Sequence, residues 1–303
     1  MKEQLNRRLS ELEEVARGTK LNRLFHRPCR YFQGQFFNHV FYKSTKKGKL
    51  VRARTFFDTE MQILLPAGMD IYLLGGKTHD SEVRLTRFML EHLKEGDTVL
   101  DVGTHFGFYS LLAAKLVGDS GRVIGIEASE AIFQIYKSNT TAAKNIKPFH
   151  LAAAEESGEV SFFEFPILFS EYNTLSPDQF EEADWIKRNP PKEIKVKGQR
   201  LEDVLHHENA QADFIKIDVE GAEDKAINGL TAILKESAPL VALEYLADER
   251  ENQAHIKAEN QLKKLGYKAH LITPSGQLIP IENVTQYMRA SKRDSDNVIF
   301  KKI

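Results

Sequence analysis

Cysteine is nearly absent from this chain of 303 residues, in which Cys29 is the only one. A single cysteine excludes an intrachain disulfide framework and a cysteine-rich zinc site, and it suits a reducing compartment. No uncharged apolar run approaches the length needed to cross a bilayer. The N-terminal segment carries Glu3, Glu11, Glu13 and Glu14 and has no apolar signal core. We therefore predict a globular cytoplasmic protein.

Acidic residues are missing from one long stretch, because no Asp or Glu occurs between Val15 and Phe57, although the whole chain has a net charge of −1. Eleven cations lie in this stretch: Arg17, Lys20, Arg23, Arg27, Arg30, Lys43, Lys46, Lys47, Lys49, Arg52 and Arg54. Nine aromatic residues are interleaved with them: Phe25, Tyr31, Phe32, Phe36, Phe37, Phe41, Tyr42, Phe56 and Phe57. The simplest interpretation is a small basic subdomain whose aromatic residues form its own core. The alternative is peripheral contact of residues 17–54 with an anionic membrane or a lipid-linked glycan. No recognised nucleic-acid motif accompanies the charge, so we expect no nucleic-acid partner.

The first 78 residues are expected to form a unit separate from residues 79–303. Four apolar residues recur at alternating steps of four and three: Leu5, Leu9, Leu12 and Ala16. This spacing predicts an amphipathic helix that ends near Gly18 and either packs on the body of the protein or pairs with a second subunit in a homodimer. Short aromatic and β-branched runs predict a few strands between residues 30 and 74. Ser81 is predicted to cap a helix that Gly96 closes.

From residue 98 onward, strand and helix patterns alternate. The predicted strands are 99–102, 122–126, 149–152, 160–165, 214–217, 240–243, 267–272 and 298–301, and the predicted helices are 106–117, 130–144, 222–235 and 252–265. Alternation of buried apolar strands with helices predicts an α/β fold with a mostly parallel, doubly wound sheet and helices on both faces. Two insertions, residues 166–193 and 273–296, are candidates for lids or binding loops.

The most informative motif is the glycine turn that follows the first strand of this alternating region. Asp101 ends the strand, and Gly103 and Gly107 bracket the turn. Glycine suits a sharp bend that a ligand approaches closely. The dinucleotide pattern Gly-x-Gly-x-x-Gly fails, because His105 and Phe108 occupy its second and third glycine positions. An acidic strand end followed by spaced glycines resembles the first motif of S-adenosylmethionine-dependent methyltransferases, and this resemblance implies an adenosyl cofactor.

The next strand ends in Glu127, which lies 20 residues beyond Gly107. A carboxylate at this position can accept hydrogen bonds from both hydroxyls of a ribose. We therefore predict that Glu127 binds the cofactor ribose.

Further carboxylates are predicted at the same edge of the sheet. The strand 214–217 brings Lys216, Asp218 and Glu220 close together, and the neighbouring strand ends in Glu244. A buried lysine needs a carboxylate partner, so Lys216 has a structural role, a catalytic role or both. Carboxylates that converge beside a cofactor crevice form a candidate acid/base or metal site.

The chain resembles the FkbM family of methyltransferases across residues 81–300. The segments that carry the resemblance are Asp-Val-Gly-Thr-His-Phe-Gly from Asp101, Ile-Glu-Ala from Ile126, Leu-Glu-Asp from Leu201, Phe-Ile-Lys-Ile-Asp-Val-Glu-Gly-Ala-Glu from Phe214, Glu244, Leu-Gly-Tyr from Leu265 and Asn-Val-Ile-Phe from Asn297. The resemblance implies a class I, Rossmann-like methyltransferase fold with seven strands and methyl transfer to a hydroxyl, often on a sugar or natural product. It implies these cofactor-binding residues: Asp101, Gly103, Thr104, His105, Gly107, Tyr109, Glu127, Ala128, Ala153 and Asp218. Two positions depart from the family, with His105 in place of Asn and Ala128 in place of Pro.

Our hypothesis is an S-adenosylmethionine-dependent O-methyltransferase acting on a sugar, glycan or glycolipid-type acceptor. Asp218 or Glu220 is the expected base, with Glu244 and His105 as less favoured candidates. In a variant of this hypothesis the three carboxylates gather Mg²⁺, but no recognised cation motif is present, so we predict no metal. The rival functions are a non-catalytic binding protein at membranes or glycan assemblies and an NAD-dependent oxidoreductase, which the failed glycine pattern disfavours.

Overall fold

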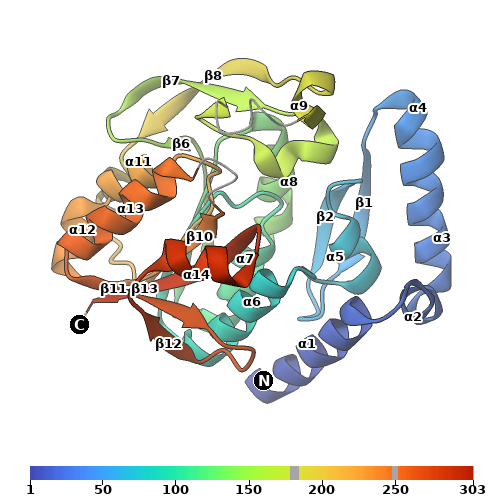
Figure 1. The fold of residues 1–303 in the computed structure, drawn as a ribbon, viewed down its shortest axis with the longest axis horizontal. Helices are drawn as coiled ribbons and strands as arrows, with labels where there is room; N and C mark the ends of the chain where they lie inside the picture. The colour runs from blue at the N-terminus through green and yellow to red at the C-terminus, as the bar shows by residue number, and fades with distance from the viewer. Residues whose placement is uncertain (178–183, 248–251, 303) are drawn as a thin grey trace.

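The computed structural model describes residues 1–177, 184–247 and 252–302. Eight strands form its central sheet: β3 (Thr98–Val102), β4 (Arg122–Glu127), β5 (Ile146–His150), β9 (Phe214–Ile217), β10 (Leu240–Leu246), β11 (Tyr267–Ile272), β12 (Leu278–Ile281) and β13 (Ser295–Lys302). Their order is β12-β11-β13-β10-β9-β3-β4-β5 (Figure 1). The five strands from β10 to β5 are parallel, whereas β13 runs antiparallel to both of its neighbours. Seven strands match predicted ones, and β12 is an eighth that forms inside the predicted 273–296 loop.

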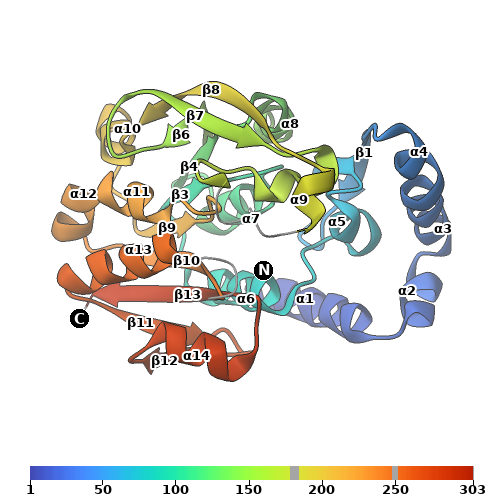
Figure 2. The ribbon, with the colours of Figure 1, turned by 45° about the horizontal axis from the view of Figure 1, so that its top comes forward.

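Helices cover both faces of this sheet (Figures 1 and 2). One face packs against α6 (Asp80–His92), α7 (Phe108–Val117) and α8 (Glu130–Thr140), and the other against α10 (Leu201–His207), α11 (Glu223–Asn228), α12 (Thr231–Glu236), α13 (Gln253–Lys264) and α14 (Val284–Ser291). Strand alternation divides the core in two, so that Val99 joins the first hydrophobic cluster and Leu100 the second. The predicted doubly wound α/β architecture is confirmed.

A small second sheet lies over the end of the central one. It comprises β6 (Ala152–Ala153), β7 (Gly158–Glu164) and β8 (Lys192–Gln199), in the order β6-β8-β7. Between β7 and β8 the insertion forms a 3-10 helix, η2 (Ile167–Tyr172), and a short helix, α9 (Asp184–Arg188). The part of the insertion at 178–183 lies outside the described residues.

The N-terminal region is mostly helical. Its elements are α1 (Lys2–Arg17), α2 (Lys20–His26), α3 (Pro28–Phe36), a π-helix, η1 (Phe37–Tyr42), α4 (Lys43–Thr45), β1 (Lys49–Arg54), β2 (Glu60–Leu65) and α5 (Met69–Leu74). The helix predicted before Gly18 is confirmed, and its apolar face is buried in the same cluster as the core of α6. The division at residue 78 remains a prediction.

The strands expected from residue 30 were only partly right, because residues 28–45 are helical and only β1 and β2 are strands. The reason is the period of the aromatic residues. Gly34, Phe37 and Tyr42 face inward and are buried, whereas Phe32 and Phe36, one helical turn apart, face outward. The aromatic composition suggested strands, but the spacing is helical.

Several predicted helix boundaries were wrong, among them the end of the helix predicted over 130–144, because α8 ends at Thr140. His79, not Ser81, caps α6, and Ser81 lies buried inside the first turn, where its Oγ contacts His79 Nδ1 at 2.8 Å. The helix ends at His92, before Gly96 is reached. The single helix predicted over 222–235 is broken into α11 and α12 at Gly229, whose backbone packs against the carbonyl of Ala154.

Among the described helices, none is both long and apolar enough to span a bilayer.

Candidate active site

The glycine turn after β3 is shaped by its contact with the neighbouring strand. Gly103 has φ +80°, and a Cβ atom there would lie 1.8 Å from the carbonyl oxygen of Asp218. Gly107 has φ +89°, and a Cβ atom there would lie 2.5 Å from the ring of Tyr136. We expected a ligand to require these glycines, but the atoms that exclude a side chain belong to the protein itself. Residue 103 is therefore glycine because β3 and the end of β9 approach so closely.

A cavity of about 760 Å³ opens at this carboxyl edge of the sheet. Its volume is within the range of about 300–1,000 Å³ that small-molecule sites occupy. Eight of the twelve predicted site residues line it: Gly103, His105, Glu127, Ala128, Ala153, Asp218, Glu220 and Glu244. The structure thus brings together residues that are up to 141 positions apart in the sequence.

The other four predicted residues lie behind the cavity wall. Tyr109 donates to the carbonyl of Glu82 at 3.3 Å, Thr104 is buried, and Gly107 begins α7. Asp101 is buried and accepts a hydrogen bond of 2.6 Å from Ser110 Oγ through its Oδ2. These residues support the wall and do not form its surface.

Glu127 is held in place by two backbone donors. Its Oε2 accepts from the His105 N–H and its Oε1 from the Ser129 N–H, both at 2.9 Å. Burial raises the pKa of this carboxyl to about 7, although the two N–H groups oppose the shift. Each carboxylate oxygen has a second lone pair, and the residue lines the cavity. The carboxylate therefore fits the two adjacent hydroxyls of a ribose.

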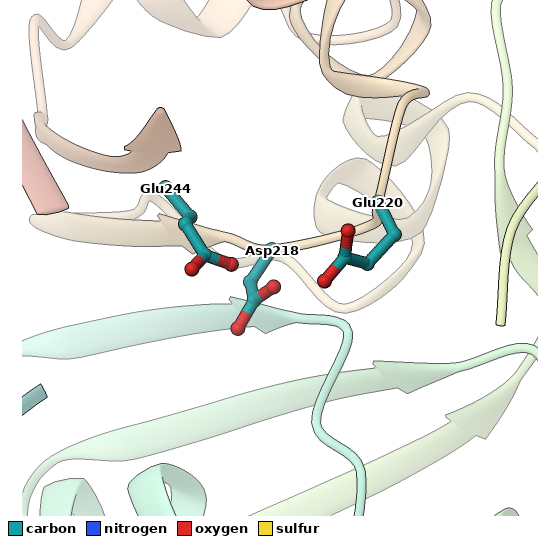
Figure 3. Close-up of side chains that lie close together, drawn as sticks. All are labelled: Asp218, Glu220 and Glu244. Carbon is teal, nitrogen blue, oxygen red and sulfur yellow. The ribbon is translucent and has the colours of Figure 1, made fainter. Parts of the chain in front are cut away.

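Three carboxylates meet on the opposite wall. Figure 3 shows Glu244 on β10 beside Asp218 and Glu220, which follow β9. One oxygen of each side chain lies within 4.8 Å of an oxygen of the other two. Glu220 has φ +50°, a left-handed conformation that turns the chain sharply after the strand.

Lys216 is the counter-ion of this cluster. Its Nζ donates to Asp218 Oδ2 at 2.9 Å and lies 4.0 Å from Asp101 Oδ1, which has no hydrogen-bond donor among the described residues. Burial lowers the pKa of Lys216, but attraction by Asp218 and Asp101 outweighs it, so the pKa is raised and the amine stays charged. A carboxylate partner was expected for Lys216, with Asp218 and Glu220 as the candidates, and the structure has Asp218 as that partner.

The pKa values of the Asp218 and Glu244 carboxyls are shifted in opposite directions. Burial, together with the negative charges of Asp218 and Glu220, raises the pKa of Glu244 well above its usual value. Burial acts in the same direction on Asp218, but the charge of Lys216 dominates and its pKa is lowered. Of the two carboxyls, Glu244 therefore holds a proton more tightly and Asp218 is the one that favours the charged form.

His105 contributes a neutral imidazole to the cavity. Its Nε2 lies 3.1 Å from Ser170 Oγ, and burial lowers the pKa of the ring to about 4. An uncharged ring that is hydrogen-bonded to a hydroxyl favours the interpretation that His105 replaces the amide of Asn.

Sequence reasoning missed a second charged cluster in the cavity. Lys77 Nζ lies 3.1 Å from both Glu82 Oε1 and Glu171 Oε1, and all three side chains line the cavity. Lys77 follows a short helix that had not been predicted, so nothing in the sequence placed it near Glu171.

The insertion supplies the aromatic part of the wall. Tyr172 and Trp185 line the cavity with ring centroids 5.3 Å apart, and Trp185 stacks on Phe169 at 4.6 Å. The prediction that residues 166–193 include a binding loop is consistent with this position. The sequence feature that indicated a binding loop was the presence of Tyr172, Asn173 and Trp185 within a long connection between strands.

The same three carboxylates are the group that could hold a cation, and they offer oxygen ligands of the kind Mg²⁺ prefers. Lys216 already pairs with one of them, Asp218, and the raised pKa of Glu244 favours its neutral form. That the protein works without a metal ion stays a prediction.

Comparison with known proteins places this cavity in context. A family model described as the methyltransferase FkbM domain matches residues 101–269, more than half of the chain. Over 65 residues the chain is 37% identical to a ribosomal protein L11 methyltransferase of Dictyoglomus turgidum, covering 22% of this chain and 21% of that protein. A probable cobalt-precorrin-6B C(15)-methyltransferase of Saccharolobus solfataricus is 38% identical over 58 residues, 19% of this chain and 29% of that protein. The chain thus spans less than a third of the curated relatives it matches.

A solved structure of methyltransferase FkbM from Methylobacillus flagellatus aligns with 78% of this chain and 52% of its own, at 15% identity and a TM-score of 0.43. The part of the chain that the family model matches includes the end of β3 and all of β4, β9 and β10, the strands that carry the candidate site.

Proposed function

This chain belongs to the FkbM methyltransferase family, and from that premise we propose that it transfers a methyl group from S-adenosylmethionine to a hydroxyl oxygen of a sugar or glycan acceptor. The observation that carries the proposal is that Asp218, which accepts a hydrogen bond from Lys216, lines the same cavity as Glu127. The carboxylate of Glu127 is placed to accept hydrogen bonds from a ribose.

Glu127 and the turn from Gly103 to His105 would hold the cofactor. The carboxylate of Glu127 would accept both ribose hydroxyls, and Ala128 and Ala153 leave room beside it because their side chains are small. When bound, S-adenosylmethionine supplies a methyl carbon on a positively charged sulfur. Alignment of the acceptor oxygen with that carbon can account for about 7–11 kcal/mol of the barrier.

Asp218 would take the proton of the acceptor hydroxyl. An aliphatic hydroxyl is a poor nucleophile at neutral pH, and its proton becomes far more acidic as the new bond to carbon forms, so a carboxylate of low pKa is a sufficient acceptor. The pKa of Glu244 is raised, so this carboxyl favours its protonated form and is the weaker candidate. A carboxylate oxygen of Glu220 lies within 4.8 Å of one of Asp218, so Glu220 stays a second candidate for the base.

The aromatic wall supports a sugar acceptor. Tyr172 and Trp185 offer flat apolar surfaces for the C–H faces of a pyranose, and Asn173 offers an amide beside them. The Lys77 cluster adds charged groups that can accept or donate hydrogen bonds to ring hydroxyls. An apolar wall that faces a polar one suits an amphipathic ligand such as a glycan.

The test is transfer of a tritiated methyl group from S-adenosylmethionine to a glycan fraction. The wild-type protein and the Asp218→Asn variant, which lacks the candidate base, are assayed in parallel. We expect label in O-methyl sugars that survive mild alkali, and we expect the variant to bind S-adenosylhomocysteine but not to label the acceptor. Label in alkali-labile esters or in protein would refute the acceptor class. Cofactor binding without turnover on any hydroxyl acceptor would instead support a non-catalytic role.

A further inference from the structure

Exposed apolar side chains are concentrated in one part of the N-terminal region. Of the ten large hydrophobic residues exposed in the described chain, seven lie between residues 21 and 50: Leu21, Phe25, Phe32, Phe36, Val40, Phe41 and Leu50. Phe25, Phe32 and Phe36 are 79%, 63% and 66% exposed. Single exposed apolar residues are ordinary, but a cluster of this kind marks an interaction surface.

Six of the seven residues lie on the helices α2, α3 and η1 at the outer edge of the molecule, and Leu50 lies on the strand β1. In Figures 1 and 2, α2, α3 and α4 form a layer beyond β1 and α5, away from the helices α11–α13. Phe32, Phe36 and Val40 recur every four residues along α3 and η1, so they lie close to one helix face. The opposite face holds Gly34 and Phe37, which are buried against the protein.

The charged residues of the segment that carries this cluster have one sign. Exposed cations flank the apolar side chains: Arg23, Lys43, Lys46, Lys47, Lys49 and Arg52. Within the ranges that the structure describes, Lys43, Lys47 and Lys49 have no carboxylate partner. No acidic residue occurs from residue 16 to 57. We call the seven apolar residues and these six cations the basic–aromatic face.

We propose that the basic–aromatic face docks on an anionic phospholipid bilayer, with its phenylalanines in the headgroup region and its cations on lipid phosphates. Phenylalanine and leucine between lysines and arginines on short helices is the composition that binds in the plane of a membrane interface. Each cation near such a surface strengthens binding by about fivefold.

Charge argues against a second copy of the chain as the occupant. A two-fold symmetric dimer would place this face against itself, so cations would oppose cations across the contact. The aliphatic members Leu21 and Val40 argue against nucleic acid, because bases stack on flat rings and gain little from aliphatic side chains.

The face is connected to the wall of the cavity. Tyr42, the buried residue that ends η1, accepts a hydrogen bond of 3.2 Å from the N–H of Leu168 in η2. The same 3-10 helix carries Ser170, Glu171 and Tyr172, which line the cavity. If the proposed function holds, docking would present the cavity to an acceptor anchored in the lipid.

Membrane docking is measured without cofactor or acceptor, so its failure is independent of the proposed function. The probe is flotation of the full chain with vesicles of phosphatidylcholine and phosphatidylglycerol at 3:1, at 50 mM and 300 mM salt, beside vesicles of phosphatidylcholine alone. We expect binding to the anionic vesicles that weakens at the higher salt.

Two pairs of matched variants test the face itself. Replacing Lys47 and Lys49 with Gln should weaken partitioning by about 25-fold, since two cations are lost, whereas replacing Lys268 and Lys301 with Gln should leave it unchanged. Phe32→Ser with Phe36→Ser should abolish insertion, whereas Ile279→Ser, at another exposed apolar residue on the edge strand β12, should not.

Cys29 provides a further readout, because it is exposed on α3 and is the only thiol in the chain. An environment-sensitive fluorophore on Cys29 should shift to the blue when anionic vesicles are added. The proposal is overturned if anionic vesicles do not bind at 50 mM salt, if control and face variants lose binding equally, or if the face proves to be a dimer contact in sedimentation analysis. Binding of RNA without binding of vesicles would overturn it as well.

Discussion

Binding of the cofactor is expected to release a proton from Glu127 near neutral pH. Burial raises the pKa of this carboxyl to about 7, so at pH 7 the unliganded protein carries about half a proton there. A ribose that donates two hydrogen bonds requires the ionised form. Binding at pH 7 should therefore release about 0.5 proton, and affinity should fall about tenfold from pH 8 to pH 6.

The same group sets a pH dependence of stability in the unliganded protein. The folded pKa lies above the ordinary value of 4.5, so between about pH 4.5 and pH 7 the folded state binds a proton that the unfolded state has lost. Stability contributed by protonated Glu127 is therefore present at low pH and is lost as pH rises through 7. The shift corresponds to about 3 kcal/mol once the group is fully ionised.

Titration calorimetry with S-adenosylhomocysteine in buffers of different ionisation enthalpy measures the proton release. Glu127→Gln should abolish the release and weaken binding by about 10–100-fold, since hydrogen bonds to a charged acceptor are lost. Asp70→Asn is the matched control, because burial raises the pKa of Asp70 to about 7 as well, yet the residue does not line the cavity. The reasoning fails if wild-type protein releases no proton, or if Asp70→Asn removes the release and Glu127→Gln does not.

Three further predictions concern the turn and the carboxylates. Asp218→Asn should lower kcat by about 10²–10⁴-fold with cofactor affinity changed less than about threefold, measured by single-turnover methyl transfer; undiminished turnover removes Asp218 from the mechanism. Gly103→Ala should destabilise the protein by about 2–4 kcal/mol in urea unfolding, whereas Gly96→Ala, at φ +91° but with open space around it, should cost only about 1 kcal/mol; equal losses would contradict the contact with Asp218. His105→Asn should keep activity within about threefold and leave the pH profile between 6 and 9 unchanged, because the pKa of His105 is lowered to about 4; loss of an acid limb would show that the imidazole titrates in catalysis.

The parts of the site that the sequence predicted are those fixed by the ends of strands. Asp218, Glu127 and Glu244 each follow a short apolar run, and in a parallel sheet the carboxyl ends of such runs meet at one edge. The roles of these residues stay predictions, but their convergence on one cavity follows from the topology. The alternation of strands and helices from residue 98 onward is confirmed for the same reason, since buried parallel strands have a strong sequence signal.

What the sequence did not predict depends on contacts between distant segments. In the cavity Lys77 pairs with Glu171, which is 94 positions away in the insertion, and no local pattern encodes that pairing. At the break between α11 and α12, Gly229 approaches the carbonyl of Ala154, which is 75 residues away. The helical region 28–45 was missed because aromatic residues lie on both of its faces, which obscures a single apolar stripe.

The approach of Gly103 to the carbonyl of Asp218 has a consequence for engineering this protein. Gly103 lies in the loop that would bind the nucleoside, and it packs directly against the backbone of Asp218, the candidate base. A substitution at either position would disturb the other, so residues 103 and 218 are poor targets for mutant libraries. The insertion is tied to this region through Ser170, which lies 3.1 Å from His105 Nε2, and through Thr174, which donates a hydrogen bond to the carbonyl of Glu220. Tyr172 and Trp185 line the cavity between and beyond these two residues and can be varied while Ser170 and Thr174 are kept. A search for altered acceptor preference should therefore start there.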